Sequence, residues 1–203
     1  MPLRVLVFLV LLCPALGWAA PTILVLGDSL SAAYGIDTRE GWVSLLGNRL
    51  EDQGYPHRVA NASISGETTR GGLTRLPELL ERHEPALVVL ELGGNDGLRG
   101  IAPAASKQHL AQMIELSQQS GAKVLLLGVQ LPPNYGPAFT ERFAAIFNEL
   151  AESHDIALVP FMLEGIATDP QLMQADGIHP VAEAQPKILE LVWPELEPLL
   201  ERE

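Results

Sequence analysis

The sequence predicts an α/β fold in which helices cover both faces of a five-stranded parallel sheet. Three observations predict it. Five short apolar segments have the character of buried strands, segments with helical spacing of apolar residues lie between them, and no linker, repeat or low-complexity stretch divides the chain. Parallel strands buried on both faces are apolar without interruption, and each crossover between them needs room for a helix. At 203 residues, 47% of them hydrophobic, the chain is long enough for one domain with a proper core.

The first 19 residues have the pattern of a secretory signal peptide. Arg4 supplies their only charge, 5–16 is almost wholly apolar, and Gly17 and Ala19 provide the small residues that a signal peptidase reads. The apolar run is too short for a transmembrane helix, which needs about 20 residues. We therefore expect cleavage after Ala19, a single domain over 20–203, a periplasmic or secreted location and no stable membrane anchor. An uncleaved N-terminal anchor is the alternative.

The composition argues against several classes of function. Acidic residues number 25 against 13 Lys and Arg, a formal charge of −12, whereas nucleic acids and anionic membranes need clustered basic residues. The single cysteine, Cys13, lies in the predicted signal peptide, so the mature chain offers no thiol nucleophile, thiolate zinc site or iron–sulfur cluster. The His-Glu-x-x-His pattern of zinc hydrolases is absent from the sequence. We expect no nucleic-acid partner, no metal and no cofactor.

The five predicted strands are short, and most of them end at glycine or at polar residues. They are expected at 22–27, 58–61, 86–92, 123–128 and 156–159. The clearest are the first, an apolar run that ends at Gly27, and the third, which is apolar up to Glu91. Because ligands of such sheets bind beyond the carboxyl ends of the strands, the residues that follow each strand are candidates for a site.

The predicted helices alternate with these strands. They are expected at 41–53, 68–83, 103–119, 139–153 and 181–200. In the first two, apolar residues recur at helical spacing along one face. Gly54 ends the first helix and Gly121 ends the third. The last helix contains Pro186 and Pro194, where we expect it to be interrupted.

Two polar segments follow the first two strands. The first, 27–30, is Gly-Asp-Ser-Leu, and a serine on a turn from strand to helix exposes its hydroxyl at the edge of the sheet. Asp28 and Ser29 are equally typical of a helix N-cap, so this segment alone leaves both interpretations open. The second segment, 61–68, contains Gly66, which either lets the backbone approach a ligand closely or simply forms a turn.

Two further segments carry an amide, an acid and a histidine. Residues 93–97 follow the third strand as Gly-Gly-Asn-Asp-Gly and place Asn95 in a tight polar loop, for which a plain turn is the alternative. Residues 176–180 precede the last helix, and Asp176 and His179 are close enough in this loop to enter one site. By themselves they are equally typical of a loop cap and a surface residue before proline. Four other histidines lie in polar contexts, where we expect them to face solvent: His57, His83, His109 and His154.

Together, Ser29, Gly66, Asn95, Asp176 and His179 supply a nucleophile, two donor groups and an acid–base pair, which are the parts of a serine hydrolase. The sequence resembles the SGNH, or GDSL, hydrolase superfamily, whose four blocks carry a Ser, a Gly, an Asn and a His at the matching places. Five blocks, in order, are similar to the bacterial periplasmic thioesterase, protease and lysophospholipase branch of that superfamily: 27–32, 61–66, 91–100, 131–136 and 176–180.

The resemblance implies the fold, the chemistry and the roles of these residues. The implied fold is a three-layer α/β/α sandwich of flavodoxin-like type around a five-stranded parallel sheet. Ser29 is implied as the nucleophile, His179 as general base and then general acid, and Asp176 as the residue that orients His179. The Ser29 and Gly66 N–H groups and the Asn95 amide are implied as the oxyanion hole. The implied activities are esterase, arylesterase, thioesterase and lysophospholipase, with an acyl ester, thioester or lysophospholipid as substrate, and we expect a monomer.

The pocket for the acyl chain is expected among residues that flank the motifs: Leu30, Gly97, Leu98, Leu131, Tyr135 and Ile178. Several of these are explained equally well as ordinary core or surface residues. A carbohydrate O-acetylesterase of the same superfamily is the alternative enzyme, and it needs a short polar pocket. A catalytically inactive lipid- or sugar-binding module is the alternative from another class, and the presence of Ser29, Asn95, Asp176 and His179 argues against it.

Overall fold

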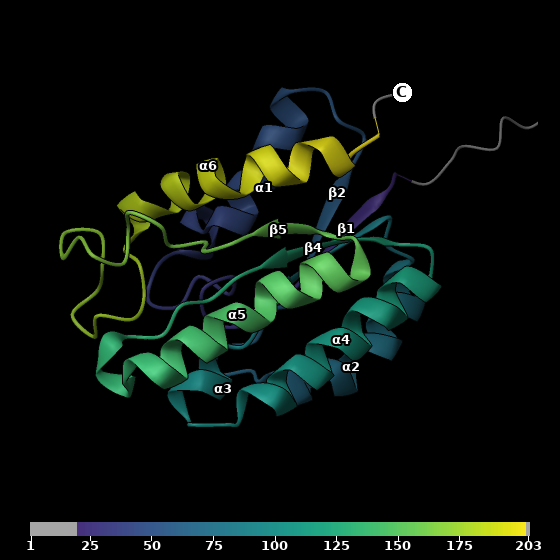
Figure 1. The fold of residues 1–203 in the computed structure, drawn as a ribbon. Coiled ribbons are helices and arrows are strands. Elements are labelled where there is room, and N and C mark those ends of the chain that lie inside the picture. Colours follow the sequence, from purple (N-terminus) through teal and green to yellow (C-terminus); the bar gives the residue numbers. More distant parts are fainter. Residues whose placement is uncertain (1–19, 202–203) are drawn as a thin grey trace, which may run out of the picture.

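Five parallel strands form one sheet in the order β2-β1-β3-β4-β5 (Figure 1). The computed structural model describes residues 20–201, so the predicted signal peptide lies outside the described residues. The strands are β1 (Thr22–Gly27), β2 (Arg58–Asn61), β3 (Leu87–Glu91), β4 (Lys123–Leu127) and β5 (Ala157–Val159). All five predicted strands are confirmed, and no bound differs by more than one residue.

Helices cover both faces of the sheet. They are α1 (Trp42–Asp52), α2 (Thr69–His83), α3 (Gly94–Leu98), α4 (Pro103–Gln119), α5 (Pro137–His154) and α6 (Gln185–Leu196). In Figure 1, α1 and α6 lie above the sheet, and α2, α4 and α5 lie below it. The predicted α/β fold, with a parallel sheet between two helical layers, is therefore confirmed.

Alternate residues of the strands fill two apolar cores, one on each face of the sheet. In β1, Ile23 and Val25 pack with α1 and α6, whereas Leu24 and Leu26 pack with α2, α4 and α5. All four side chains are fully buried. Burial on both faces explains why this strand is apolar without interruption, and it fixes β1 in the middle of the domain.

Two segments differ from the sequence prediction. The predicted loop at 93–97 instead contains α3, a single short helix that begins at the second glycine, Gly94. The last helix is shorter than predicted, because the turns on each side of α6 are 3-10 helices, at Ala182–Ala184 and Glu197–Leu199. The interruption expected at Pro186 is wrong: this proline lies in the first turn of α6, where the missing N–H is not needed. Pro194 lies inside α6, which continues past it.

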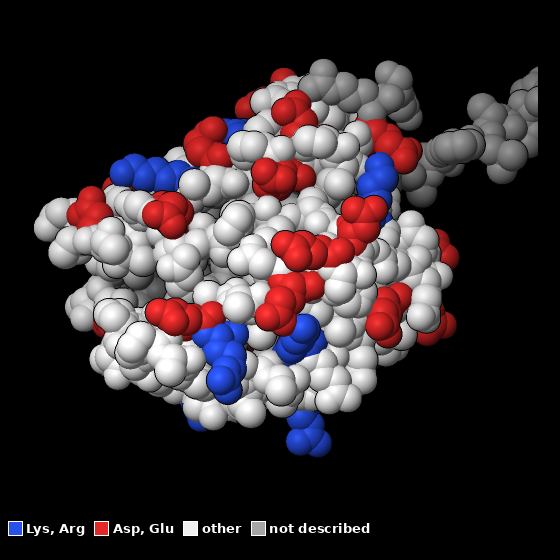
Figure 2. All heavy atoms as spheres, viewed as in Figure 1, with Lys and Arg blue, Asp and Glu red and all other residues white. Residues whose placement is uncertain are grey.

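The loops that follow the strands gather at one edge of the sheet, on the left of Figure 1. Acidic side chains are spread over the face of the molecule shown in Figure 2, in keeping with the formal charge of −12. Within residues 20–201, no helix is both long enough and apolar enough to cross a membrane. The candidate site residues of the sequence analysis lie at this edge, in the loops or in α3, except for Tyr135, which ends a 3-10 helix at Pro133–Tyr135.

Candidate active site

Ser29 lies on a turn at the carboxyl end of β1. The turn is closed by a backbone hydrogen bond of 2.9 Å, which Ala32 N donates to Asp28 O. Gly27 precedes the turn, and a Cβ at that position would lie 2.7 Å from Glu91 Oε2, so no larger residue fits there. The strand, the glycine and the turn hold the half-buried Ser29 at the edge of the sheet.

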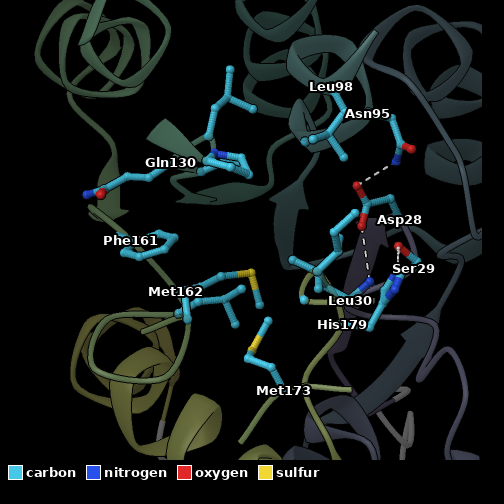
Figure 3. A pocket seen from close by; sticks show the side chains of 18 of the residues that line it. Asp28, Ser29, Leu30, Asn95, Leu98, Gln130, Phe161, Met162, Met173 and His179 are labelled. Carbon is cyan, nitrogen blue, oxygen red and sulfur yellow. Dashed lines mark hydrogen bonds between the residues drawn. The ribbon is translucent and has the colours of Figure 1, made fainter. Parts of the chain in front are cut away.

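A chain of hydrogen bonds links Ser29 to His179 and Asp176. His179 Nε2 lies 2.9 Å from Ser29 Oγ, and His179 Nδ1 lies 2.7 Å from Asp176 Oδ2. A dashed line in Figure 3 marks the hydrogen bond between His179 and Ser29. Asp176 Oδ1 also accepts hydrogen bonds from the backbone N–H groups of Ile178 and His179, at 2.9 and 3.0 Å. The loop before α6 therefore folds around the Asp176 carboxylate, and this carboxylate holds the imidazole ring in position.

The charge of Asp176 sets the direction of proton transfer along these hydrogen bonds. Desolvation raises the pKa of Asp176, but the hydrogen bonds from the His179 ring and from the His179 and Ile178 backbone outweigh it and lower that pKa to about 2. Asp176 is therefore an anion near neutral pH and accepts the Nδ1–H of His179. The other ring nitrogen, Nε2, then directs its lone pair at Ser29 Oγ and can accept the hydroxyl proton.

The Tyr34 ring covers the imidazole of His179. The two ring centroids are 4.4 Å apart with an angle of 39° between the ring planes. Gln174 joins the two loops, because its Nε2 donates to Tyr34 O at 2.8 Å and its backbone N donates to His179 O at 2.7 Å. The turn after Ser29 and the loop that carries His179 are thus tied together, and Tyr34 lies on their outer side with 51% of its surface exposed.

Two backbone donors lie at the same edge. Ala62 N donates to Val25 O at 2.8 Å, which ties the loop after β2 to β1 and brings Gly66 close. Gly66 has a φ of 81°, in the left-handed region that favours glycine. Within the part of the chain that the structure describes, the N–H groups of Ser29 and Gly66 donate to no protein acceptor. Both groups are therefore available to a ligand.

Asn95 lies in the first turn of α3, and its side-chain amide contacts Asp28 (Figure 3). Asn95 Nδ2 donates to Asp28 Oδ2 at 2.9 Å, and the second hydrogen of that nitrogen remains for another acceptor. Burial raises the pKa of Asp28 to about 6, against the opposing effect of the hydrogen bonds from Leu30 and Asn95. Burial and the nearby charge of Asp28 raise the pKa of Glu91 well above its usual value. Above about pH 6, Asp28 therefore carries a negative charge.

An apolar pocket of about 460 Å³ opens beside Ser29. Figure 3 shows Ser29, Asn95 and His179 on one side of it, and Phe161 and Met162 on the opposite side. The pocket lies between the loops that follow β1, β3, β4 and β5. Its size and its apolar lining suit a hydrocarbon chain whose polar end lies at Ser29.

Four of the six predicted pocket residues line this cavity: Leu30, Leu98, Leu131 and Ile178. The other two do not. Gly97 lies behind the pocket wall, where a Cβ would be 2.3 Å from Leu131 Cδ2, so its role is to let α3 pack closely on Leu131. Tyr135 lies at the rim, and its hydroxyl donates to Leu98 O at 3.0 Å.

The sequence analysis missed the part of the pocket that follows β4 and β5. Its members include Val129, Gln130, Phe161, Met162, Leu163 and Met173. A signal was present, because several of these residues come directly after predicted strands, as the motif segments do. Apolar residues in that place are equally typical of the core, however, and only the folded chain shows that they face a cavity.

The histidines outside the site are more buried than expected. None of the four is fully exposed, and the expectation is wrong for His109 above all. His109 Nδ1 lies 3.0 Å from Thr69 Oγ1, between α4 and α2. Within residues 20–201, no three His, Cys, Asp or Glu side chains form a group that could hold a metal ion.

The parallel α/β sheet and the Ser–His–Asp arrangement at its carboxyl edge define the class of serine hydrolases. Residues 25–185 match the GDSL-like Lipase/Acylhydrolase family, and the chain belongs to that family.

Similar proteins agree with this assignment. Esterase TesA of Pseudomonas aeruginosa is 60% identical over 182 residues, which cover 90% of both chains. Thioesterase 1/protease 1/lysophospholipase L1 of Escherichia coli is 45% identical over 182 residues, which cover 90% of this chain and 86% of that one. The crystal structure of TesA superposes with a TM-score of 0.87 and covers 88% of this chain and 99% of its own. The predicted family and its three-layer fold are confirmed.

Proposed function

We propose that the protein is a serine hydrolase that cleaves carboxylic esters and acyl thioesters through an acyl-enzyme intermediate. The observation that carries the proposal is the hydrogen-bonded chain from Ser29 through His179 to Asp176, at one end of an apolar pocket. The relatives are named an esterase and a thioesterase, protease and lysophospholipase, which supports the same classes of substrate.

Acylation uses the hydrogen-bonded residues Ser29, His179 and Asp176. His179 Nε2 takes the proton of Ser29 Oγ while that oxygen forms a bond to the acyl carbon. Asp176 keeps Nδ1 protonated and stabilises the imidazolium. The imidazolium then gives its proton to the leaving alcohol or thiol, the C–O or C–S bond breaks, and the acyl group stays on Ser29.

Deacylation repeats these steps with water. His179 removes a proton from the water molecule, whose oxygen attacks the acyl carbon, and Ser29 Oγ leaves with a proton from His179. In both half-reactions, the acyl oxygen becomes negative in a tetrahedral intermediate. The free N–H groups of Ser29 and Gly66, with the second N–H of Asn95, are the donors for this oxygen.

The pocket supports a medium or longer acyl chain as the substrate group. Leu30, Met162 and Met173 lie along it, and burying one methylene group stabilises binding by about 0.8 kcal/mol. A carbohydrate O-acetylesterase has no use for such a cavity. We expect an eight-carbon ester to be hydrolysed with a higher kcat/KM than an acetylated sugar, and the reverse preference would favour the O-acetylesterase.

The nucleophile is tested with Ser29→Ala. Turnover of an ester falls by about 10⁶, as for nucleophile removal in other serine hydrolases, while the melting temperature stays the same. A phosphonate ester adds once to the unmodified protein and not to the variant, as seen by intact mass. Ser153→Ala, at an exposed serine near the end of α5, is the matched control. This variant keeps both the turnover of the ester and the reaction with the phosphonate. Near-normal turnover by the Ser29 variant would overturn the proposal.

We propose also that residues 1–19 are removed on export and that the mature protein is periplasmic or secreted. The basic start, the apolar run and the small residues near Ala19 support this location. Sequencing the N-terminus of the protein from the extracytoplasmic fraction tests it. A mature chain that still begins at Met1 would contradict the cleavage.

A further inference from the structure

The Asn95 amide serves an oxyanion only if its nitrogen, rather than its oxygen, is turned toward the Ser29 hydroxyl. The two ends of an amide side chain have nearly the same shape, so packing alone does not choose between them. Asn95 lines the pocket and is half-buried. A specific hydrogen-bond partner is therefore needed to hold the amide in the productive orientation.

The Asp28 carboxylate is in the position to do this. Its Oδ2 accepts from Asn95 Nδ2 at 2.9 Å, and its Oδ1 accepts from Leu30 N at 3.1 Å. Dashed lines in Figure 3 mark these two hydrogen bonds. Asp28 is only 3% exposed, so water competes little for either oxygen. Because a carboxylate only accepts, the amide presents its nitrogen to Asp28, and the second hydrogen of that nitrogen points elsewhere.

We propose that Asp28 is a positioning residue of the oxyanion hole: its carboxylate sets the orientation of the Asn95 amide, whose second N–H then meets the negative oxygen of the tetrahedral intermediate. The inference rests on the proposed function, because it gives Asp28 a part in the same reaction. Asp28 makes and breaks no bond itself and acts through Asn95.

Three elements hold Asp28 in place. Its backbone N–H donates to Glu91 Oε2 of β3 at 3.1 Å, and Ser31 Oγ donates to the same oxygen at 2.8 Å. A Cβ on Gly94 would lie 3.3 Å from Asp28 Oδ2, so the start of α3 also approaches the carboxylate closely. β1, β3 and α3 therefore converge on one carboxylate, which is directed at the one side-chain amide of the implied oxyanion hole.

The charges near Asp28 permit this role. The titratable groups that act on it are Glu91, from β3, and His179, from the loop before α6. Burial and the charge of Asp28 raise the pKa of Glu91 well above its usual value. Burial raises the pKa of Asp28 to about 6, against the hydrogen bonds and the charge of His179. Above that pH, Asp28 is an anion and accepts from Asn95.

The test is a double-mutant cycle of Asp28→Asn and Asn95→Ala. The amide in the Asp28 variant has one oxygen for two donors, and the backbone N–H of Leu30 cannot turn away. The nitrogen of the substituted side chain therefore faces Asn95, and because that nitrogen is a donor, the Asn95 amide turns its oxygen toward it. We expect Asp28→Asn to lower kcat by about 10² with little change in KM, and Asn95→Ala to lower it by about 10²–10³.

The double variant decides between the two roles of Asp28. If Asp28 acts through Asn95, the double variant has the kcat of Asn95→Ala within about twofold, because the second substitution removes nothing more. Losses that multiply, or an Asp28→Asn enzyme with unchanged kcat, would overturn the inference. An unchanged kcat would show that Asp28 is only a cap of the Ser29 turn, and losses that multiply would show that it acts independently of Asn95.

A second measurement needs no Asp28 variant, so it tests the role of Asp28 even if Asp28→Asn is unstable. The ratio of kcat for the unsubstituted enzyme to kcat for Asn95→Ala is followed between pH 5 and 8, because effects of pH that are common to both enzymes cancel in this ratio. When Asp28 Oδ2 is protonated it donates, and the Asn95 amide turns its oxygen toward it. The ratio should fall from about 10²–10³ toward one as pH drops through the pKa of Asp28. A ratio that is constant with pH would contradict the inference.

The matched control is Asp169→Asn. Asp169 accepts the Gln171 N–H at 2.9 Å in the same local geometry, but on the surface, and its substitution should leave kcat unchanged. Melting temperatures confirm that each variant is folded. Phosphonate labelling of Ser29 separates the two proposals: labelling with additive losses overturns only the role of Asp28, whereas no labelling overturns the hydrolase itself.

Discussion

The segment from β3 to α3 buries two carboxyl groups, Glu91 and Asp96, and surrounds them in opposite ways. Both are fully buried. Asp96 accepts from Thr69 N at 2.9 Å, from Thr69 Oγ1 at 2.5 Å and from Ser106 Oγ at 3.1 Å, so both of its oxygens are used. Glu91 receives donors on Oε2 alone, and within the described residues its buried Oε1 has no hydrogen-bond partner.

This difference in hydrogen bonding indicates that Asp96 stabilises the fold, whereas Glu91 supports the candidate site. Asp96 ties the start of α2 to α3 and α4, and His109 Nδ1 extends this network through Thr69 Oγ1. Glu91 lies instead beneath Asp28, where burial raises the pKa of both acids. Complete donor sets are typical of buried groups that stabilise a fold, and incomplete ones are concentrated where function requires them. The stability of the domain should therefore depend on Asp96, and its chemistry on the groups around Ser29.

The largest effect is expected on the catalytic side, for Asp176→Asn. The amide keeps the shape of the loop but can hold the wrong tautomer of His179, so kcat should fall by up to about 10⁴. The melting temperature should change little, because the Asp176 side chain is 39% exposed. Steady-state kinetics and thermal unfolding on one preparation test this. A loss of stability as large as that of Asp96→Ala would contradict the assignment of Asp176 to the chemistry and Asp96 to the fold.

The next effect is expected on the structural side, for Asp96→Ala. The substitution leaves the donors of Thr69 and Ser106 buried without an acceptor, and the free energy of unfolding should fall by about 3 kcal/mol or more. The kcat of the folded fraction should stay within about tenfold. Asp96→Asn retains one acceptor and should lose less. Urea unfolding and kinetics measure both quantities, and a full loss of activity at unchanged stability would reverse the comparison.

The burial of Asp28 beside Glu91 should make the stability of the protein depend on pH. Its folded-state pKa is raised from 3.8 to about 6, so its contribution to stability is complete below pH 3.8 and is lost as pH rises through 6. The loss amounts to about 3 kcal/mol. Asp28→Asn lacks this titration, so the stability of the unsubstituted protein relative to the variant should fall between pH 4 and 7. A relative stability that rises with pH would show that the Asp28 carboxylate is favourably paired.

The smallest effect is expected for Tyr34→Leu, on the outer side of His179. An aromatic face stabilises an adjacent imidazolium by about 0.5–1 kcal/mol at an exposed site, so kcat should fall a few-fold. Tyr34→Phe keeps the ring and should restore the rate. Kinetics of both variants measure the effect. Equal losses for Leu and Phe would assign the effect to the hydroxyl instead of the ring.

The sequence by itself determined the order of the elements and supplied the candidates for the site. The five strands and the two helical layers follow from apolar periodicity, which is a property of neighbouring residues. Ser29, Gly66 and Asn95 became candidates because they follow predicted strands, whose carboxyl ends must meet at one edge of a parallel sheet. Asp176 and His179 became candidates because they are close together in one loop. The resemblance to the SGNH family implied the role of each.

Only the tertiary structure decided which side chains face one another. Asp28 and Asn95 are 67 positions apart in the sequence, and no local pattern pairs them. The same holds for Met162 and Met173 in the pocket and for Tyr34 on His179. Orientation in space depends on the packing of whole elements against each other, and burial of a carboxyl group depends on what packs above it. That is why the sequence marked Asp28 as an N-cap candidate, while the folded chain shows it holding the Asn95 amide.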